Sequence, residues 1–299
     1  MTANRPDGHN PQAPAWTAVG LPHVTVNSML FARNPADTQA VDTLRAALTS
    51  GDCVPSHLER ARVVNDDEPV TVFLAYWDDP AGYEHWRLRD DVTDALSNPG
   101  VLEEVATIPA ERWETLHSTS ETTPGVRNLT PAQPTEVHEY WGAARDRIPA
   151  SAVSDLSSDP GVPLPANLCL IRSGQIWEHC EQDERNLYFE QVAPNLAAGI
   201  EFLAQTPETG CISSRFLREQ TLDGQDLEST SFVGWFRDLA SLEEWSRSHP
   251  THLAIFESFL SMVGQLGGQI QLRLWHEVAV LPVGGVSLGG TDPSPLASL

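Results

Sequence analysis

The sequence predicts an α+β fold made of two tandem ferredoxin-like halves, each with the element order β-α-β-β-α-β. The first observation is the order of apolar periodicities, which switch between period two and period 3.6 in the same succession twice. The second is an internal echo, in which residues 76–86 resemble residues 235–245 at a constant spacing. Two such sheets packed face to face would form a dimeric-α+β-barrel-like sandwich.

The first half is predicted from alternating strands and from helices with turn signals at their ends. We expect strands and helices in the order strand, helix, strand, strand, helix, strand at residues 23–33, 37–50, 57–65, 70–77, 80–89 and 112–117. Residues 90–111 are interpreted as an irregular acidic run. The segment 137–147 is helix-like and aromatic.

The second half follows the same order. We expect a strand at 168–173, a long helix at 183–205, two strands at 211–221 and 228–236, a helix from Pro250, and a last strand at 270–280. Asp223-Gly224 predicts the hairpin between the two middle strands. The domain prediction is therefore a flexible N-terminus (1–20), a first half (21–118), a connecting segment with a short helix (119–166), a second half (167–282) and a disordered tail (283–299).

Composition limits the partners and the location. The 299 residues carry a net charge of −23, and the sequence pI is about 4.6. Nucleic acid and anionic membranes are therefore poor partners. No apolar run reaches membrane-spanning length, and the polar, proline-rich start has no signal-peptide core. The four cysteines show no disulfide-like or zinc-like spacing, which favours a reducing, cytoplasmic location.

Histidines mark the end of the second half. His249 and His252 lie at the start of the predicted last helix, and His276 falls on the mostly apolar side of the last strand. A histidine that points into a core needs a hydrogen-bond partner or a chemical role. It is either a satisfied core residue or an axial ligand, because a neutral imidazole in apolar surroundings suits haem iron.

Glu114 is the second candidate group. The triplet ending in Glu114 echoes the triplet ending in His276, so the two residues are expected to hold equivalent places in the two halves. A carboxylate and an imidazole that converge on one cavity suit proton transfer. The alternative is a surface charge on a strand.

Several blocks together resemble the haem-containing aldoxime dehydratases. They are EYWGAARDRIP, NLCLIRSGQ, GCISSRF, WSRSHPTHLAIF and LWHEVAV between residues 137 and 280, with weaker blocks VFLAYWDDPAGYEHW and RWETL before them. The resemblance implies two fused ferredoxin-like halves with ferrous haem b between sheet and helices. It also implies a homodimer that converts an aldoxime, R–CH=N–OH, to a nitrile and water, with the oxime nitrogen on the iron.

The resemblance also assigns roles residue by residue. His252 corresponds to the proximal haem ligand and His276 to the distal acid/base histidine. Ser173 and Arg147 correspond to distal polar residues, and Glu114 to the acid that supports the distal histidine. Trp275 stands where the family pattern has tyrosine.

Alternatives stay open at this point. His249 competes with His252 as iron ligand, Ser173 is also explained as a turn residue before Gly174, and Arg147 as part of a surface ion pair with Asp146. The function also has rivals: a haem enzyme for another N–O or N–N compound, a non-catalytic haem-binding protein, or a cofactor-free α+β dimer.

Overall fold

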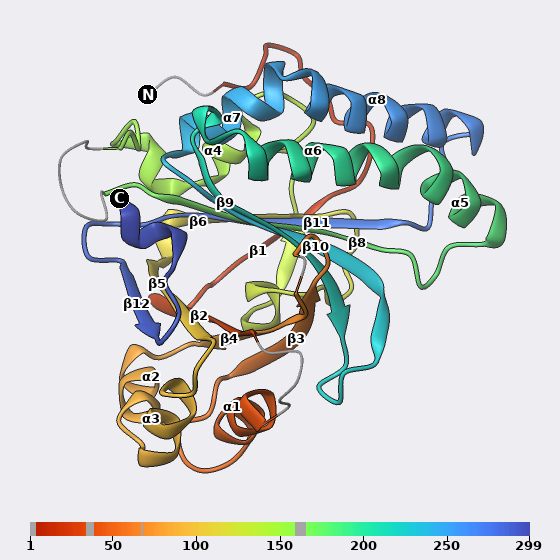
Figure 1. The fold of residues 1–299 in the computed structure, drawn as a ribbon. Coiled ribbons are helices and arrows are strands. Elements are labelled where there is room, and N and C mark those ends of the chain that lie inside the picture. Colours follow the sequence, from red (N-terminus) through yellow and green to blue (C-terminus); the bar gives the residue numbers. More distant parts are fainter. Residues whose placement is uncertain (1–3, 34–38, 67, 159–165) are drawn as a thin grey trace.

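The computed structural model describes residues 4–33, 39–66, 68–158 and 166–299. It is an α+β fold in which one large antiparallel sheet is covered by helices (Figure 1). The sheet has 12 strands in the order β12-β5-β2-β4-β3-β9-β10-β8-β11-β6-β1-β7. No helix in the described part of the chain is both long and apolar enough to cross a membrane.

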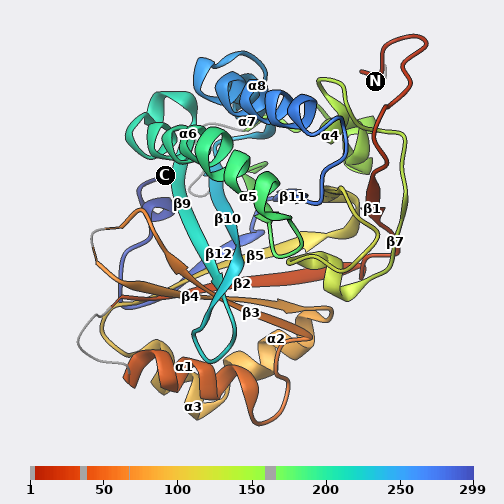
Figure 2. The ribbon, with the colours of Figure 1, turned by 90° about the vertical axis from the view of Figure 1, so that its right-hand side faces the viewer.

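The first half of the chain forms one layer of this sheet. Its strands lie in the order β5-β2-β4-β3, and their bounds are β2 Val24–Arg33, β3 His57–Val63, β4 Val70–Trp77 and β5 Val101–Pro109. Helices α1 (Gln39–Thr49), α2 (Pro80–Arg87) and α3 (Asp90–Leu96) cover the outer face of this layer (Figure 2). The strand β4 is apolar except for Thr71 because it lies inside the sheet, with one face on these helices and the other on the second layer.

The second half forms the opposite layer. Its strands lie in the order β9-β10-β8-β11, and their bounds are β8 Cys169–Ile176, β9 Cys211–Gln220, β10 Asp226–Phe236 and β11 Arg273–Val280. The two layers are joined through the antiparallel pair β3–β9. Their inner faces share one apolar core, which includes Leu74, Trp235 and Ala279.

Helices cover the outer face of the second layer (Figure 2). They are α5 (Gln182–Leu187), a π-helical turn (Tyr188–Val192), α6 (Ala193–Gln205), α7 (Leu239–Ser248) and α8 (Pro250–Gln265). The predicted long helix at 183–205 thus contains a π turn, which ends two residues before Pro194, a residue without an N–H donor. Between the halves, the predicted helix at 137–147 is confined to α4, Ala143–Arg147.

The sequence echo has a structural cause in two helix N-termini. Asp79 accepts hydrogen bonds from the backbone N–H groups of Ala81 and Gly82 at the start of α2. Asp238 accepts one from Ser241 at the start of α7. Aspartate satisfies the unpaired donors of a first helical turn, so the same residue type recurs at the same place in each half.

The last strand of the first half was predicted wrongly. It is β5, within the segment interpreted as irregular, and not residues 112–117. Two buried glutamates interrupt the apolar pattern of this strand, so the sequence does not indicate it. Glu103 pairs with Arg87, and Glu104 pairs with Arg215. Strand β6 (Trp113–His117) instead adds to the second half beside β11. Glu114 and His276 are therefore neighbours on adjacent strands, and not equivalents in two halves.

Both chain ends contain regular elements in the described residues. Strand β1 (Trp16–Ala18) pairs with β6 and with β7 (Ala132–Pro134), and β12 (Val286–Gly290) pairs with β5. A 3-10 helix, Pro295–Ser298, buries Leu296, and the Ser294 hydroxyl donates to Glu104. Glycine, serine and proline in the tail resemble a disordered composition, but tertiary contacts order it.

We expect Leu296→Ala to lower the free energy of unfolding by roughly 2–5 kcal/mol, the usual cost of truncating a buried leucine. Leu296 is 1% exposed, whereas Leu299 is 47% exposed. Leu299→Ala is therefore the matched control, with an expected change below about 0.5 kcal/mol. Urea unfolding of the two variants measures both values. Equal effects would mean that the tail does not contribute to the core.

Candidate active site

A buried acid–base cluster lies on the helix-covered face of the second layer. In β6 and β11, Val278 pairs with Glu114 and Leu116 pairs with His276, so both titratable side chains face the same side. His276 Nε2 lies 3.0 Å from Glu114 Oε1. Arg147 Nε donates to Glu114 Oε2 at 2.7 Å, and Arg147 Nη2 lies 3.1 Å from His276 Nε2. Imidazole, carboxylate and guanidinium therefore meet at one point.

Arg147 is placed by the short helix α4 at its last turn. Its side chain is 5% exposed, and Nη1 donates to the Val137 carbonyl. Two residues earlier, Arg145 forms hydrogen bonds through two nitrogens with Glu243 of α7. This double contact ties α4 to the helical layer. Arg147 thus forms a buried pair with Glu114, and not the surface pair with Asp146; Asp146 instead accepts from the Tyr140 hydroxyl and from Asn4.

Glu114 is held as a carboxylate. Burial acts to raise its pKa, but the charges of Arg147 and His276 and their hydrogen bonds outweigh burial, so the pKa lies below its ordinary value. An ionised Glu114 pairs with Arg147 and leaves its second oxygen directed at the imidazole. The carboxylate therefore orients the His276 ring.

The Nε2 atom of His276 lies within reach of an acceptor, Glu114 Oε1, and of a donor, Arg147 Nη2. Neutral Nε2 accepts from the arginine, whereas protonated Nε2 donates to the carboxylate. One proton therefore switches the partner of the ring. A group whose two protonation states both find partners is suited to give and to take a proton within one reaction.

Ser173 lies beside this cluster. In the β8–β11 pair, Ser173 is directly opposite His276. Directly opposed residues project from the same face of a sheet, with Cβ atoms about 5 Å apart. Ser173 lies inside a strand rather than in a turn, so its hydroxyl is placed next to the imidazole.

His252 lies on the first turn of α8, in the helical layer that covers the same face. Its Nδ1 is buried and has no hydrogen-bond partner among the described residues. The Trp245 ring contacts the imidazole edge-on, with the ring centroids 4.8 Å apart. Burial lowers the pKa of His252 more than the Ser246 backbone raises it. The ring is therefore neutral and has an unused nitrogen, which is the state in which imidazole binds a metal.

His249 does not share these properties. Its Nδ1 accepts from the Thr251 N–H and so caps the start of α8. The ring stacks on Phe202, with the centroids 4.2 Å apart. The predicted helix carrying two histidines is thus α8 with His252 inside it and His249 at its N-cap.

The apolar face of α8 around His252 is incompletely covered by protein. Phe256, one turn after His252, is 45% exposed, and Leu260 is 50% exposed. In α8, Met262 alone is fully buried among the described residues of the helix. A helix with so much apolar surface normally packs it against another element. This face and the free nitrogen fit a large apolar group with a metal at its centre.

Four of the five predicted site residues thus come together: Glu114, Arg147 and His276 in contact, with Ser173 beside His276. His252 stands on a different element, and no hydrogen bond in the described part of the chain joins it to those four. Sequence reasoning missed the Val137 carbonyl that holds Arg147 and the Trp245 ring against His252. The first is a backbone atom without a sequence signal. The second is the last residue of the echo, but the echo does not indicate contact with a histidine.

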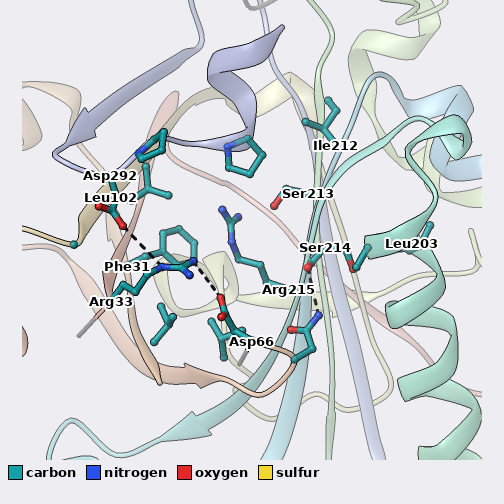
Figure 3. A pocket seen from close by; sticks show the side chains of 17 residues that line it. Phe31, Arg33, Asp66, Leu102, Leu203, Ile212, Ser213, Ser214, Arg215 and Asp292 are labelled. Carbon is teal, nitrogen blue, oxygen red and sulfur yellow. Dashed lines mark hydrogen bonds and ion pairs between the residues drawn. The ribbon is translucent and has the colours of Figure 1, made fainter. Parts of the chain in front are cut away.

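A cavity of about 520 Å³ lies elsewhere, between the two layers near the C-terminal tail (Figure 3). Arg33, Arg215 and Asp292 contribute to its wall. The arginines are already paired, Arg33 with Asp66 and Asp292, and Arg215 with Glu104. The residues known to line it include none of the five predicted site residues, and its charges are satisfied within the protein.

The fold and site define an α+β protein with an acid–base cluster and, on a separate helix, a buried histidine whose Nδ1 has no hydrogen-bond partner among the described residues. A family model described as haem-containing dehydratase matches residues 30–288. The chain is 38% identical to the phenylacetaldoxime dehydratase of Bacillus sp. (strain OxB-1), with 93% of this chain and 88% of the relative covered. It is 31% identical to the aliphatic aldoxime dehydratase of Rhodococcus erythropolis, with 94% and 88% covered.

Solved structures agree with this result. A crystal structure of an aldoxime dehydratase in complex with butyraldoxime superposes with a TM-score of 0.87 at 29% identity, covering 99% of this chain and 91% of that chain. A second aldoxime dehydratase structure gives a TM-score of 0.85. The chain belongs to the haem-containing dehydratase family.

Proposed function

We propose that this protein is a haem-dependent aldoxime dehydratase that converts R–CH=N–OH to R–C≡N and water. The observation that carries the proposal is the contact of His276 with Glu114 and Arg147 on the face that the His252 helix covers. The reaction breaks the N–O bond, removes the carbon-bound proton and adds a proton to the leaving hydroxyl. Acid–base chemistry at one imidazole matches these needs, and the named activities of the relatives support the reaction type.

His252 is the residue that would hold the haem iron. Its neutral, buried ring with a free nitrogen and the uncovered apolar face of α8 are the features that fit the cofactor. When bound, ferrous haem would supply an electron-rich iron that weakens the N–O bond of the oxime. The Trp245 ring restricts the orientation of the imidazole.

The remaining steps belong to side chains of this chain. Ser173, directly opposite His276, donates a hydrogen bond to the oxime hydroxyl and directs it towards the imidazole. His276 gives its proton to the leaving oxygen, and the neutral ring then takes the proton from carbon. Glu114 stabilises the imidazolium, and Arg147 donates a hydrogen bond to the neutral ring. The ring ends as it began, so the cycle closes without a co-reactant.

The architecture of two tandem ferredoxin-like halves is part of the same proposal. Both halves have the same strand order when counted from their own first strand: β5-β2-β4-β3 and β11-β8-β10-β9. Capping aspartates at equivalent helices support the relation. The homodimer and the cytoplasmic location stay predictions.

A visible spectrum of the purified protein tests the function. The dithionite-reduced protein should show a Soret band that shifts when butyraldoxime is added anaerobically and returns as butyronitrile forms. Acetone oxime is the matched control, because it has no carbon-bound proton at the oxime carbon and cannot give a nitrile. A Soret band without nitrile formation would point to another N–O substrate. No Soret band after haem reconstitution would exclude the haem proposal.

A further inference from the structure

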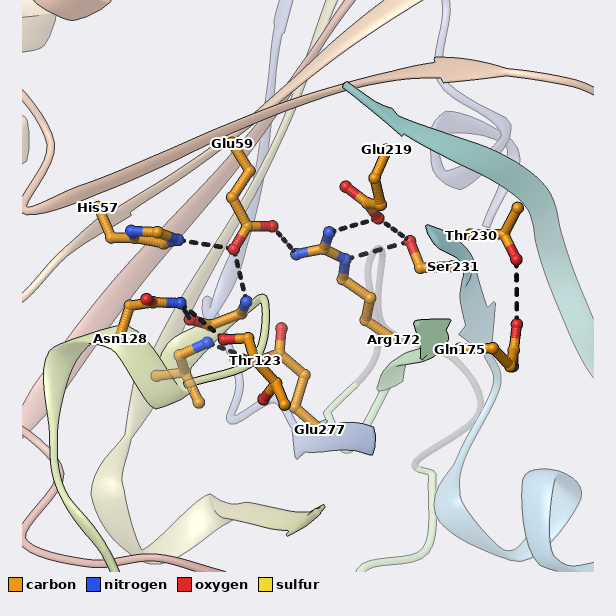
Figure 4. A network of polar contacts seen from close by, with 12 residues as sticks. His57, Glu59, Thr123, Asn128, Arg172, Gln175, Glu219, Thr230, Ser231 and Glu277 are labelled. Atoms are coloured by element: carbon orange, nitrogen blue, oxygen red, sulfur yellow. Dashed lines mark hydrogen bonds and ion pairs between the residues drawn. The ribbon is translucent and has the colours of Figure 1, made fainter. Parts of the chain in front are cut away.

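A second polar cluster lies in the core between the two layers, centred on Arg172 (Figure 4). Arg172 is fully buried and forms ion pairs with Glu59 of β3 and Glu219 of β9. Its Nη1 also lies 3.3 Å from the Tyr76 hydroxyl of β4, and that hydroxyl donates to Glu277 Oε1 of β11 at 2.7 Å. Strands from both halves therefore meet in one hydrogen-bonded network.

The network also holds the start of the segment that leads to Arg147. Glu277 Oε2 accepts from the Val126 N–H at 2.7 Å, and Glu59 Oε1 accepts from the Gly125 N–H at 2.6 Å. A Cβ added to Gly125 would lie 2.3 Å from Glu277 Oε2, and its φ of +92° favours glycine. The carboxyl groups of Glu59 and Glu277 thus hold the turn at Gly125, where a side chain would not fit.

The network lies on the opposite face of strands β8 and β11 from the proposed reaction centre. Successive residues of a strand point to opposite faces. Arg172 precedes Ser173 in β8, and Glu277 follows His276 in β11; Arg172 and Glu277 are opposite each other, as are Ser173 and His276. Ser173 and His276 are therefore each next to a member of the inner network in their own strand.

The network contains one arginine, Arg172, and three buried carboxyl groups, so its charges balance only if some of these carboxyl groups are protonated. Burial opposes ionisation of Glu59, but Arg172 and His57 keep its pKa below the ordinary value. Burial raises the pKa of Glu219, and burial raises the pKa of Glu277 to about 7, against Arg172 and the Tyr76 hydrogen bond. Arg172 is thus matched by Glu59, and Glu277 changes its charge in the neutral range.

We propose that Glu277 is a positioning residue of the reaction, which holds His276 in register from the inner face of β11 and, through its charge, favours the protonated form of that imidazole. The proposal rests on the proposed function, because it assigns His276 the proton-transfer role. The groups that face Glu277 are fixed by the same network: Arg172 of β8, Tyr76 of β4, His57 and Glu59 of β3, Glu219 of β9, Thr115 of β6 and the Val126 N–H.

The direction of the effect follows from electrostatics. Above neutral pH, Glu277 becomes negative and stabilises a positive ring on the other side of the strand. The imidazolium needed to protonate the leaving oxygen then persists to higher pH. Without the charge, turnover is lost at lower pH. A purely structural role would lower kcat by the same factor at every pH.

The test is the pH profile of kcat for aldoxime dehydration by the haem-loaded enzyme. Glu277→Gln keeps the shape of the protonated acid and removes the charge, so we expect the alkaline limb to shift downward by about half a pH unit. Tyr76→Phe removes the hydrogen bond that favours ionised Glu277. It should shift the limb in the same direction by less, and it keeps the proposal testable if the first variant folds poorly.

Glu104→Gln is the matched control. Glu104 is also a fully buried glutamate with an arginine partner, but it pairs with Arg215 away from β8 and β11. It should leave the limb in place. Unchanged profiles in both Glu277→Gln and Tyr76→Phe would overturn the inference while the dehydratase function stood. A wild-type protein that forms no nitrile would instead overturn the function itself.

Discussion

Replacing His252 by alanine is expected to give a folded protein that does not retain haem. The buried imidazole has no partner for Nδ1 in the described part of the chain, so its removal breaks no hydrogen bond at that atom. The His252 nitrogen would supply a coordination bond to the iron, which the apolar contacts of α8 cannot replace. The Soret absorbance per protein, measured after reconstitution with excess haem and gel filtration, should fall to near background.

His249→Ala is the matched control for this prediction. His249 is three residues away in the same helix start, but its nitrogen is occupied by the Thr251 cap and its ring by Phe202. The variant should lose stability by about 1 kcal/mol, as capping residues do, and keep its haem. Added imidazole should partly restore haem binding to His252→Ala. Normal haem content in His252→Ala would show that the ligand lies elsewhere.

The sequence predicts much of this site because its residues belong to regular elements. Alternation in residues 270–280 predicts a strand with His276 on its mostly apolar side, and β11 (Arg273–Val280) is this strand over most of that range. Helix periodicity correctly separates His252 from His249, since Pro250 begins α8. The periodicity of apolar residues is sufficient to predict the face on which a side chain lies, as long as tertiary packing does not change the strand or helix itself.

The pairing of distant strands could not be predicted in the same way. The predicted equivalence of Glu114 and His276 was wrong because β5 was not recognised as the last strand of the first half. Glu103 and Glu104 make β5 look polar, and their arginine partners come from α2 and β9. A buried glutamate looks like a surface residue until its arginine is located in space. For the same reason, nothing in the sequence indicates that Arg172 and Glu277 share one buried network.

Replacing His276 by alanine is expected to have the opposite signature: haem stays bound and turnover collapses. The ring contacts Glu114 and Arg147 but lies on β11, so the His252 helix is not disturbed. Loss of a positioned acid–base group usually costs about 10²–10⁴ in rate. The measurement is kcat for butyraldoxime at matched haem content, together with KM.

A fall in kcat with little change in KM distinguishes lost proton transfer from lost binding. His179→Ala, an exposed histidine just after β8, is the control and should behave as wild type. Ser173→Ala removes a hydrogen bond that directs the hydroxyl, so its loss should be smaller than that of His276→Ala. If His276→Ala kept near-normal kcat, the proton would have to come from Arg147 or from solvent. The contacts of His276 with Glu114 and Arg147 would then have only a structural role.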